Sequence, residues 1–148
     1  MESVYEAAGA MDGLIRLANA WHQRVLADEI AAHPFSHGIE PDHTERLAAY
    51  WAEALGGPPA YTSRYGDEAK VLRTHACNGP HDELDERAIG CFDQALADVG
   101  YADPLRQVLH DYFAWVTTGH IAQFHGAADA LPDGMRIPAW SWTGRVDS

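Results

Sequence analysis

The segment LIRLANAWHQRV, residues 14–25, decides the fold class of this 148-residue chain. Its apolar residues recur every three or four positions, the spacing that brings side chains onto one face of an α-helix. They are Leu14, Leu17, Ala18, Trp21 and Val25. His22 borders this apolar face, where an imidazole needs a hydrogen-bond partner or a metal because burying an unpaired polar group is costly. The segment therefore predicts an amphipathic helix with a histidine at the edge of its buried face.

Helical spacing continues along the chain, and strand signals are almost absent. Further helices are expected over residues 41–54, around 71–75, over 82–99 and from 103 through 116. His43 lies one turn before Leu47 on the apolar face of the first of these, and His75 lies on the short helix that follows. Histidines on three successive helices indicate a shared cavity with something bound in it.

The composition limits the class of protein. A length of 148 residues suits one domain, and its 47% hydrophobic fraction is that of an ordinary globular core. A net charge of -12 argues against nucleic acid and anionic membranes, which are bound through Lys and Arg. We see neither a run of 18 apolar residues nor a secretory signal. The two cysteines, Cys77 and Cys91, are too few for a disulfide framework, so we expect a cytoplasmic protein.

Short motifs along the chain carry a family resemblance. They are the glycine break from Gly9 to Gly13, the helix end from Trp21 to Asp28, Pro34-Phe35, Glu45-Arg46-Leu47, Leu55-Gly56-Gly57-Pro58 with Tyr61, the run from Leu72 to Ala76, and Cys91-Phe92. In this order and spacing they resemble the truncated haemoglobins of the second group, from about residue 4 to 124. The resemblance implies an all-α fold, a two-over-two helical sandwich around haem, in residues 1–125. Residues 126–148 then form a C-terminal extension, whose tryptophans predict that it packs onto this domain.

The resemblance also implies a cofactor and a function. His75 matches the proximal histidine of the family, the protein ligand of the haem iron. Because the chain has no Cys-x-x-Cys-His string, covalent attachment is not expected, and the cofactor implied is haem b. The expected function is to bind oxygen or another diatomic gas at this iron.

The opposite, distal side of the haem differs from the family pattern. The residues expected to line it are His22, Phe35, His43, Leu47, Ala88 and Ile89. His43 matches the distal position, His22 stands where the family most often has a tyrosine, and Ala88 stands where it commonly has a tryptophan. With both usual donors missing, the pocket must rely on the two histidines. We hypothesise that His43 rather than His22 is the main donor, and the sequence leaves open whether either binds the iron directly. A hydrogen bond between the two histidines would make their removal similar in effect and non-additive.

The haem edge and its propionates need partners at the mouth of the pocket. The residues expected there are Arg46, Tyr61, Leu72 and Arg73. Arginine and tyrosine supply the cationic and hydroxyl groups that bind carboxylates.

Three other functions compete with gas binding. The first is a haem-dependent redox enzyme, either nitric oxide dioxygenase-like or peroxidase-like, for which a reductase is a candidate partner. The second is a non-haem metal site built from His75, Cys77 and His81, which lacks the fourth ligand of a structural zinc site. The third is a helical interaction module without a ligand. The sequence leaves the physiological gas open, and it leaves the choice between a monomer and a homodimer open.

Overall fold

The computed structural model describes residues 2–32, 42–66, 82–121 and 136–146. The elements are α1 (Val4–Ala7), α2 (Ala10–Leu26), α3 (His43–Ala54), α5 (Asp82–Asp98), α6 (Leu105–Ala114), the π-helix η2 (Trp115–Ile121), β1 (Ala139–Ser141) and β2 (Gly144–Val146). In these ranges, no helix has both the length and the apolar character to cross a membrane. The helix predicted around residues 71–75 lies outside the described residues.

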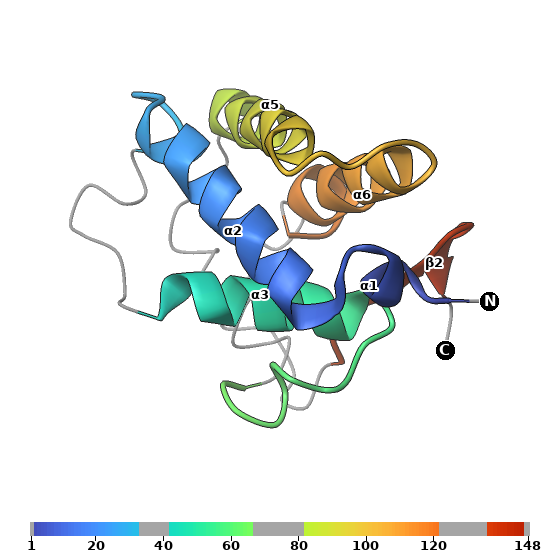
Figure 1. The fold of residues 1–148 in the computed structure, drawn as a ribbon. Helices are drawn as coiled ribbons and strands as arrows, with labels where there is room; N and C mark the ends of the chain where they lie inside the picture. Colours follow the sequence, from blue (N-terminus) through green and yellow to red (C-terminus); the bar gives the residue numbers. More distant parts are fainter. Residues whose placement is uncertain (1, 33–41, 67–81, 122–135, 147–148) are drawn as a thin grey trace.

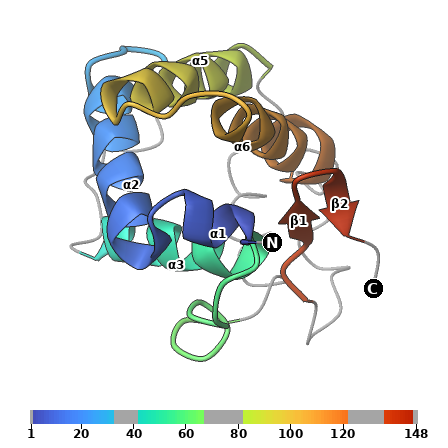
Figure 2. The ribbon, with the colours of Figure 1, turned by 45° about the vertical axis from the view of Figure 1, so that its right-hand side comes forward.

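The helices pack as two over two. Helix α2 contacts both α3 and α5, and it lies between them in Figures 1 and 2. Helices α5 and α6 lie side by side, and η2 continues α6 and also contacts α5. The apolar face predicted for residues 14–25 is buried against these neighbours, and His22 is buried with it.

Three aromatic rings from three helices form the centre of the core. Phe92 of α5 and Phe113 of α6 stack with their ring centroids 4.1 Å apart. Trp51 of α3 meets both rings edge-on, at centroid distances of 5.4 Å and 6.3 Å. Edge-to-face and stacked contacts of this kind stabilise a core beyond the area that they bury. This cluster fixes α3 against the α5–α6 pair.

A short hairpin lies within residues 136–146, and sequence analysis did not predict it. Strands β1 and β2 pair antiparallel, with Trp140 opposite Arg145. The Trp140 ring lies against Trp115 and Tyr112, at centroid distances of 5.4 Å and 6.0 Å. The Trp142 indole N–H donates to the carbonyl of Glu2 over 2.9 Å. The hairpin therefore contacts α6, η2 and the N-terminal segment; the domain boundary at residue 125 stays a prediction because residues 122–135 are outside the described part.

The start of α2 depends on a glycine at a close backbone contact. A Cβ atom added at Gly13 would lie 1.9 Å from the carbonyl oxygen of Ala8. The Tyr101 hydroxyl donates a hydrogen bond to that same oxygen, so the carbonyl is held from a second side. Neither the Ala8 carbonyl nor the Tyr101 hydroxyl can move without breaking the packing between α1, α2 and the segment after α5.

We therefore expect Gly13→Ala to lower the free energy of unfolding by about 1–3 kcal/mol, the usual cost of overpacking. Gly90→Ala is the matched control, because Gly90 is exposed within α5 and an added Cβ meets nothing within 4 Å. This control should raise the free energy of unfolding by up to about 1 kcal/mol, as alanine favours helix over glycine. Urea unfolding of both variants checks the pair, and equal effects would contradict the close contact.

Candidate functional site

Two histidines, one buried and one half-buried, meet where α2 crosses α3. The Nε2 atom of His22 and the Nδ1 atom of His43 are 2.5 Å apart, a short hydrogen bond. The two rings are stacked, with centroids 4.5 Å apart and an interplanar angle of 29°. His22 is only 7% exposed, while His43, the first residue of α3, is half-buried. The structure therefore brings together the two histidines that the sequence predicted for the distal side.

The second nitrogen of His22 also faces α3. Its Nδ1 atom lies 3.0 Å from the Oγ1 atom of Thr44, the residue after His43. His22 thus makes hydrogen bonds through both ring nitrogens to two consecutive residues. Sequence analysis missed Thr44, because a threonine in the first turn of a helix has no distinctive pattern. The one feature of the sequence that could have pointed to Thr44 is that it directly follows His43.

Burial sets the charge of His22. Removal from water lowers the pKa of His22 below its ordinary value of 6.5. The neutral imidazole is therefore the form that predominates near neutral pH. A neutral ring has one N–H donor and one acceptor nitrogen, so its two hydrogen bonds have opposite directions.

The lowered pKa predicts a loss of stability in acid. In the unfolded chain His22 binds its proton near pH 6.5, whereas in the folded chain it binds it only at lower pH. The free energy of unfolding is therefore highest well above pH 6.5, where His22 is neutral in both states. It declines as the pH falls through 6.5, by at most about 1.4 kcal/mol per pH unit. Urea midpoints measured between about pH 7.5 and 5.5 should fall more for the wild type than for His22→Gln. Identical slopes for wild type and His22→Gln would refute the prediction.

Ala88 stands where the family commonly has a tryptophan, and here its backbone contacts a tryptophan of α2. Ala88 and Ile89 of α5 are half-buried and pack against the core. The backbone carbonyl of Ala88 accepts a hydrogen bond from the indole N–H of Trp21, over 3.1 Å. The Trp21 ring is in turn 5.5 Å from the ring of His22. Trp21 therefore links the predicted Ala88 position to the histidine pair.

The remaining described site residues lie along α3 and the segment after it. Leu47 is half-buried and packs against the core. The Arg46 guanidinium donates to the Asp42 carboxylate over 2.9 Å and lies 5.1 Å from the centre of the Tyr65 ring. Tyr61 is buried, and its ring meets Tyr65 at 5.4 Å. Arg46 thus contacts Asp42 and Tyr65, and the Tyr61 ring packs in the core.

Several predicted site residues lie outside the described residues. They are Phe35, Leu72, Arg73 and His75, together with Cys77 and His81 of the alternative metal site. Their roles stay predictions. Among the residues whose placement is described, no three His, Cys, Asp or Glu side chains form a group that could hold a metal ion.

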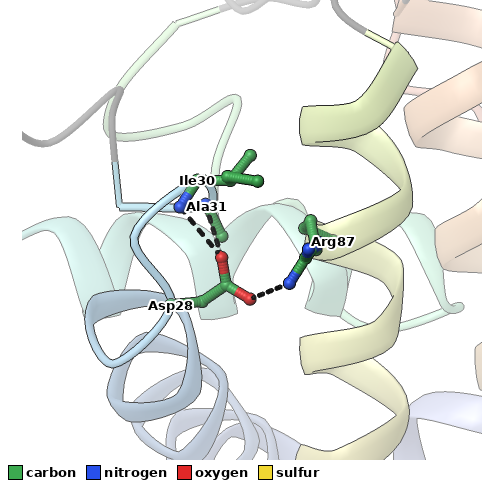
Figure 3. Close-up of polar contacts among 4 residues, drawn as sticks. All are labelled: Asp28, Ile30, Ala31 and Arg87. Atoms are coloured by element: carbon green, nitrogen blue, oxygen red, sulfur yellow. Dashed lines mark hydrogen bonds and ion pairs between the residues drawn. The ribbon is translucent and has the colours of Figure 1, made fainter.

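A polar turn follows the C-terminal end of α2, just beyond His22 and Leu26. The Asp28 carboxylate accepts hydrogen bonds from the backbone N–H groups of Ile30 and Ala31, each over 3.0 Å, and pairs with Arg87 of α5 at 3.3 Å (Figure 3). The backbone bonds, foremost that of Ala31, hold the pKa of Asp28 below its usual value. An open hollow of about 400 Å³ lies here, lined by residues 27–30 and Arg87. None of the predicted site residues lines it, so this turn ties α2 to α5 and is not the candidate site.

Comparison with known proteins defines the fold. Residues 3–120 match the family model of the bacterial-like globins. The structure is similar to a haemoglobin from Chloroflexus aurantiacus, with a TM-score of 0.71 and 24% identity over 81% of this chain and 98% of that one. It is also similar to the group II truncated haemoglobin from Bacillus anthracis, with a TM-score of 0.71 and 20% identity over 84% of this chain and 91% of that one. A third similar structure is the truncated oxygen-avid haemoglobin from Bacillus subtilis, with a TM-score of 0.69 and 22% identity over 80% of this chain and 98% of that one. No curated protein matches the sequence. The resemblance to truncated haemoglobins and the all-α truncated globin fold are confirmed, with the C-terminal hairpin as an addition.

Proposed function

Because the chain belongs to the bacterial-like globin family, we propose that it binds haem b and, at the haem iron, oxygen or another diatomic gas. When bound, haem supplies an iron atom that takes a protein ligand on one face and a gas on the other. The observation that carries this proposal is the hydrogen-bonded pair of His22, which is buried on α2, and His43, which is half-buried at the start of α3.

The proximal ligand in this proposal is His75, carried over from the family pattern. A neutral imidazole suits this role, because it binds iron through one nitrogen while its other nitrogen donates a hydrogen bond. The absence of a Cys-x-x-Cys-His string favours a cofactor held without covalent bonds. The haem is therefore expected to be extractable and of type b.

The described residues fit the distal side of such a site. A gas bound to iron takes up partial negative charge, which a neutral N–H donor stabilises by about 1–3 kcal/mol. His43 offers such a donor from the first turn of α3, with Leu47 one turn further along. Phe35, Ala88 and Ile89 would complete the apolar wall. As partners of the propionates we propose Arg46, whose guanidinium donates to Asp42, together with Tyr61, Leu72 and Arg73.

Optical spectra of the purified protein test the gas-binding proposal. We expect a strong absorption band near the violet edge of the visible range, which shifts when the reduced protein is exposed to carbon monoxide and again with oxygen. A colourless protein would support a zinc site or an interaction module and would refute the proposal. A coloured protein whose absorption spectrum changes with neither carbon monoxide nor oxygen would refute the gas-binding part alone.

The same pair favours a second candidate, haem-dependent redox catalysis. Peroxide cleavage uses a distal imidazole that accepts a proton from one oxygen and returns it to the other. In this function the outer nitrogen of His43 would have to be unprotonated, with the proton of the ring on the nitrogen that contacts His22. Oxidation of a dye by hydrogen peroxide, lost in His43→Leu, would support the peroxidase-like function. Consumption of nitric oxide by the oxygen-loaded protein would support the dioxygenase-like one, which requires a reductase partner.

A further inference from the structure

We propose that Thr44 is a positioning residue that fixes the tautomers of His22 and His43, so that both rings carry their proton on Nε2. The assignment concerns three side chains that the structure places in hydrogen-bond contact. Its consequence for a gas ligand rests on the proposed function, whereas the tautomer assignment itself does not.

The three side chains form one continuous chain of hydrogen bonds. The Oγ1 atom of Thr44 lies 3.0 Å from Nδ1 of His22, and Nε2 of His22 lies 2.5 Å from Nδ1 of His43. Thr44 and His43 are neighbours in the first turn of α3, and His22 comes from α2. His22 therefore bridges two consecutive residues of the other helix, and its ring orientation is fixed from both sides.

Only two arrangements of protons satisfy this chain when both imidazoles are neutral. Each hydrogen bond holds one proton, and each neutral ring carries one N–H and one acceptor nitrogen. In the first arrangement Thr44 donates to His22, and His22 donates to His43. In the second arrangement both bonds run the opposite way, with His43 donating to His22 and His22 donating to the Thr44 oxygen.

The intrinsic preference of the neutral imidazole selects the first arrangement. It places the proton of both rings on Nε2, the nitrogen that carries the proton in the more stable tautomer of a neutral histidine. The second arrangement would place both rings in the less stable Nδ1–H form. Burial lowers the pKa of His22, so its neutral form is the relevant one. A hydroxyl can donate as well as accept, and Thr44 is thus able to supply the proton that starts the chain.

The choice of tautomer decides what His43 can do on its far edge. In the first arrangement the Nε2 atom of His43 carries a hydrogen and donates. In the second arrangement that atom has only a lone pair and cannot donate. A donor is what the partial negative charge on a gas ligand requires. Thr44 would therefore control the distal donor through His22 without touching the ligand.

Nitrogen-15 NMR of the histidine rings tests the assignment directly. The protein is labelled at histidine and studied as purified, in the reduced form with carbon monoxide when haem is present, because that form is diamagnetic. The rings are assigned with His22→Gln and His43→Gln. We expect protonated Nε2 and unprotonated Nδ1 in both His22 and His43. Protonated Nδ1 in either ring would overturn the proposal, and this result is independent of haem binding.

Two substitutions separate the hydroxyl from the shape of Thr44. Thr44→Val keeps the branched side chain but removes the donor, so the His43 ring should become a mixture of tautomers. Oxygen release should then accelerate, by less than the factor of about ten that corresponds to a whole bond of 1.4 kcal/mol. Thr44→Ser keeps the hydroxyl and should retain the wild-type ring signals and rate. Unchanged ring signals in Thr44→Val, or the same loss in Thr44→Ser, would overturn the role of the hydroxyl.

Discussion

His75→Gly is expected to abolish stable haem binding, and added imidazole is expected to restore it. Under the proposed function, removing the side chain would take away the protein ligand of the iron and would leave a space of the size of an imidazole ring. A free imidazole can occupy that space and bind the metal in place of the histidine. The variant should therefore be purified with little haem, and its absorption band should return when haem and imidazole are added together.

Haem content per chain and the absorption spectrum measure this effect. His110→Gly is a suitable control, because His110 lies on α6 and pairs with Asp93 of α5 at 2.6 Å, within the α5–α6 pair. This control should keep its haem and should not respond to imidazole. Wild-type haem content and an unchanged spectrum in His75→Gly would show that another residue binds the iron.

The second large effect is expected at the histidine pair. His43→Leu should raise the rate of oxygen release about tenfold or more, because a lost hydrogen bond of about 1.4 kcal/mol changes an equilibrium by that factor. It should also speed autoxidation. His22→Leu should have a similar effect, since the 2.5 Å contact between the rings makes His43 depend on His22 for its orientation. The double variant should then be no worse than either single one.

Stopped-flow measurement of oxygen release on the two single variants and the double variant checks this coupling. His110→Leu serves again as the control outside the pair and should leave the rate unchanged. A normal rate in His43→Leu with a fast rate in His22→Leu would assign the distal donor to α2. Effects that multiply in the double variant would mean that the two histidines act independently.

Much of the fold could be predicted from helical spacing alone. The apolar stripe from Leu14 to Val25 is long and regular, and the structure buries that face of α2. Helix α3 ends at Ala54, just before Gly56, whose φ of 97° is readily adopted by glycine. A regular helical spacing of apolar residues and a glycine at the helix end predict a helix whatever its neighbours are, because the apolar face must be covered in any compact fold.

Other features depend on contacts between distant residues, which spacing does not reveal. The strands of the C-terminal hairpin have three residues each, too few to show an alternating pattern. The bond from Trp21 to Ala88 joins residues 67 positions apart. Thr44 gains its role only because α2 crosses α3 at His22. The sequence could predict that two histidines share a pocket, but not that a threonine links them.

Titration of haem into the haem-free chain is the most direct test of the account. Absorbance is followed as haem is added in small steps, with the His75→Gly variant measured in parallel. We expect the new band to grow linearly and to stop at one haem per chain, while the variant shows no sharp end point without imidazole. A wild-type chain that gives only the spectrum of free haem would contradict the central claim that this globin is a haem protein.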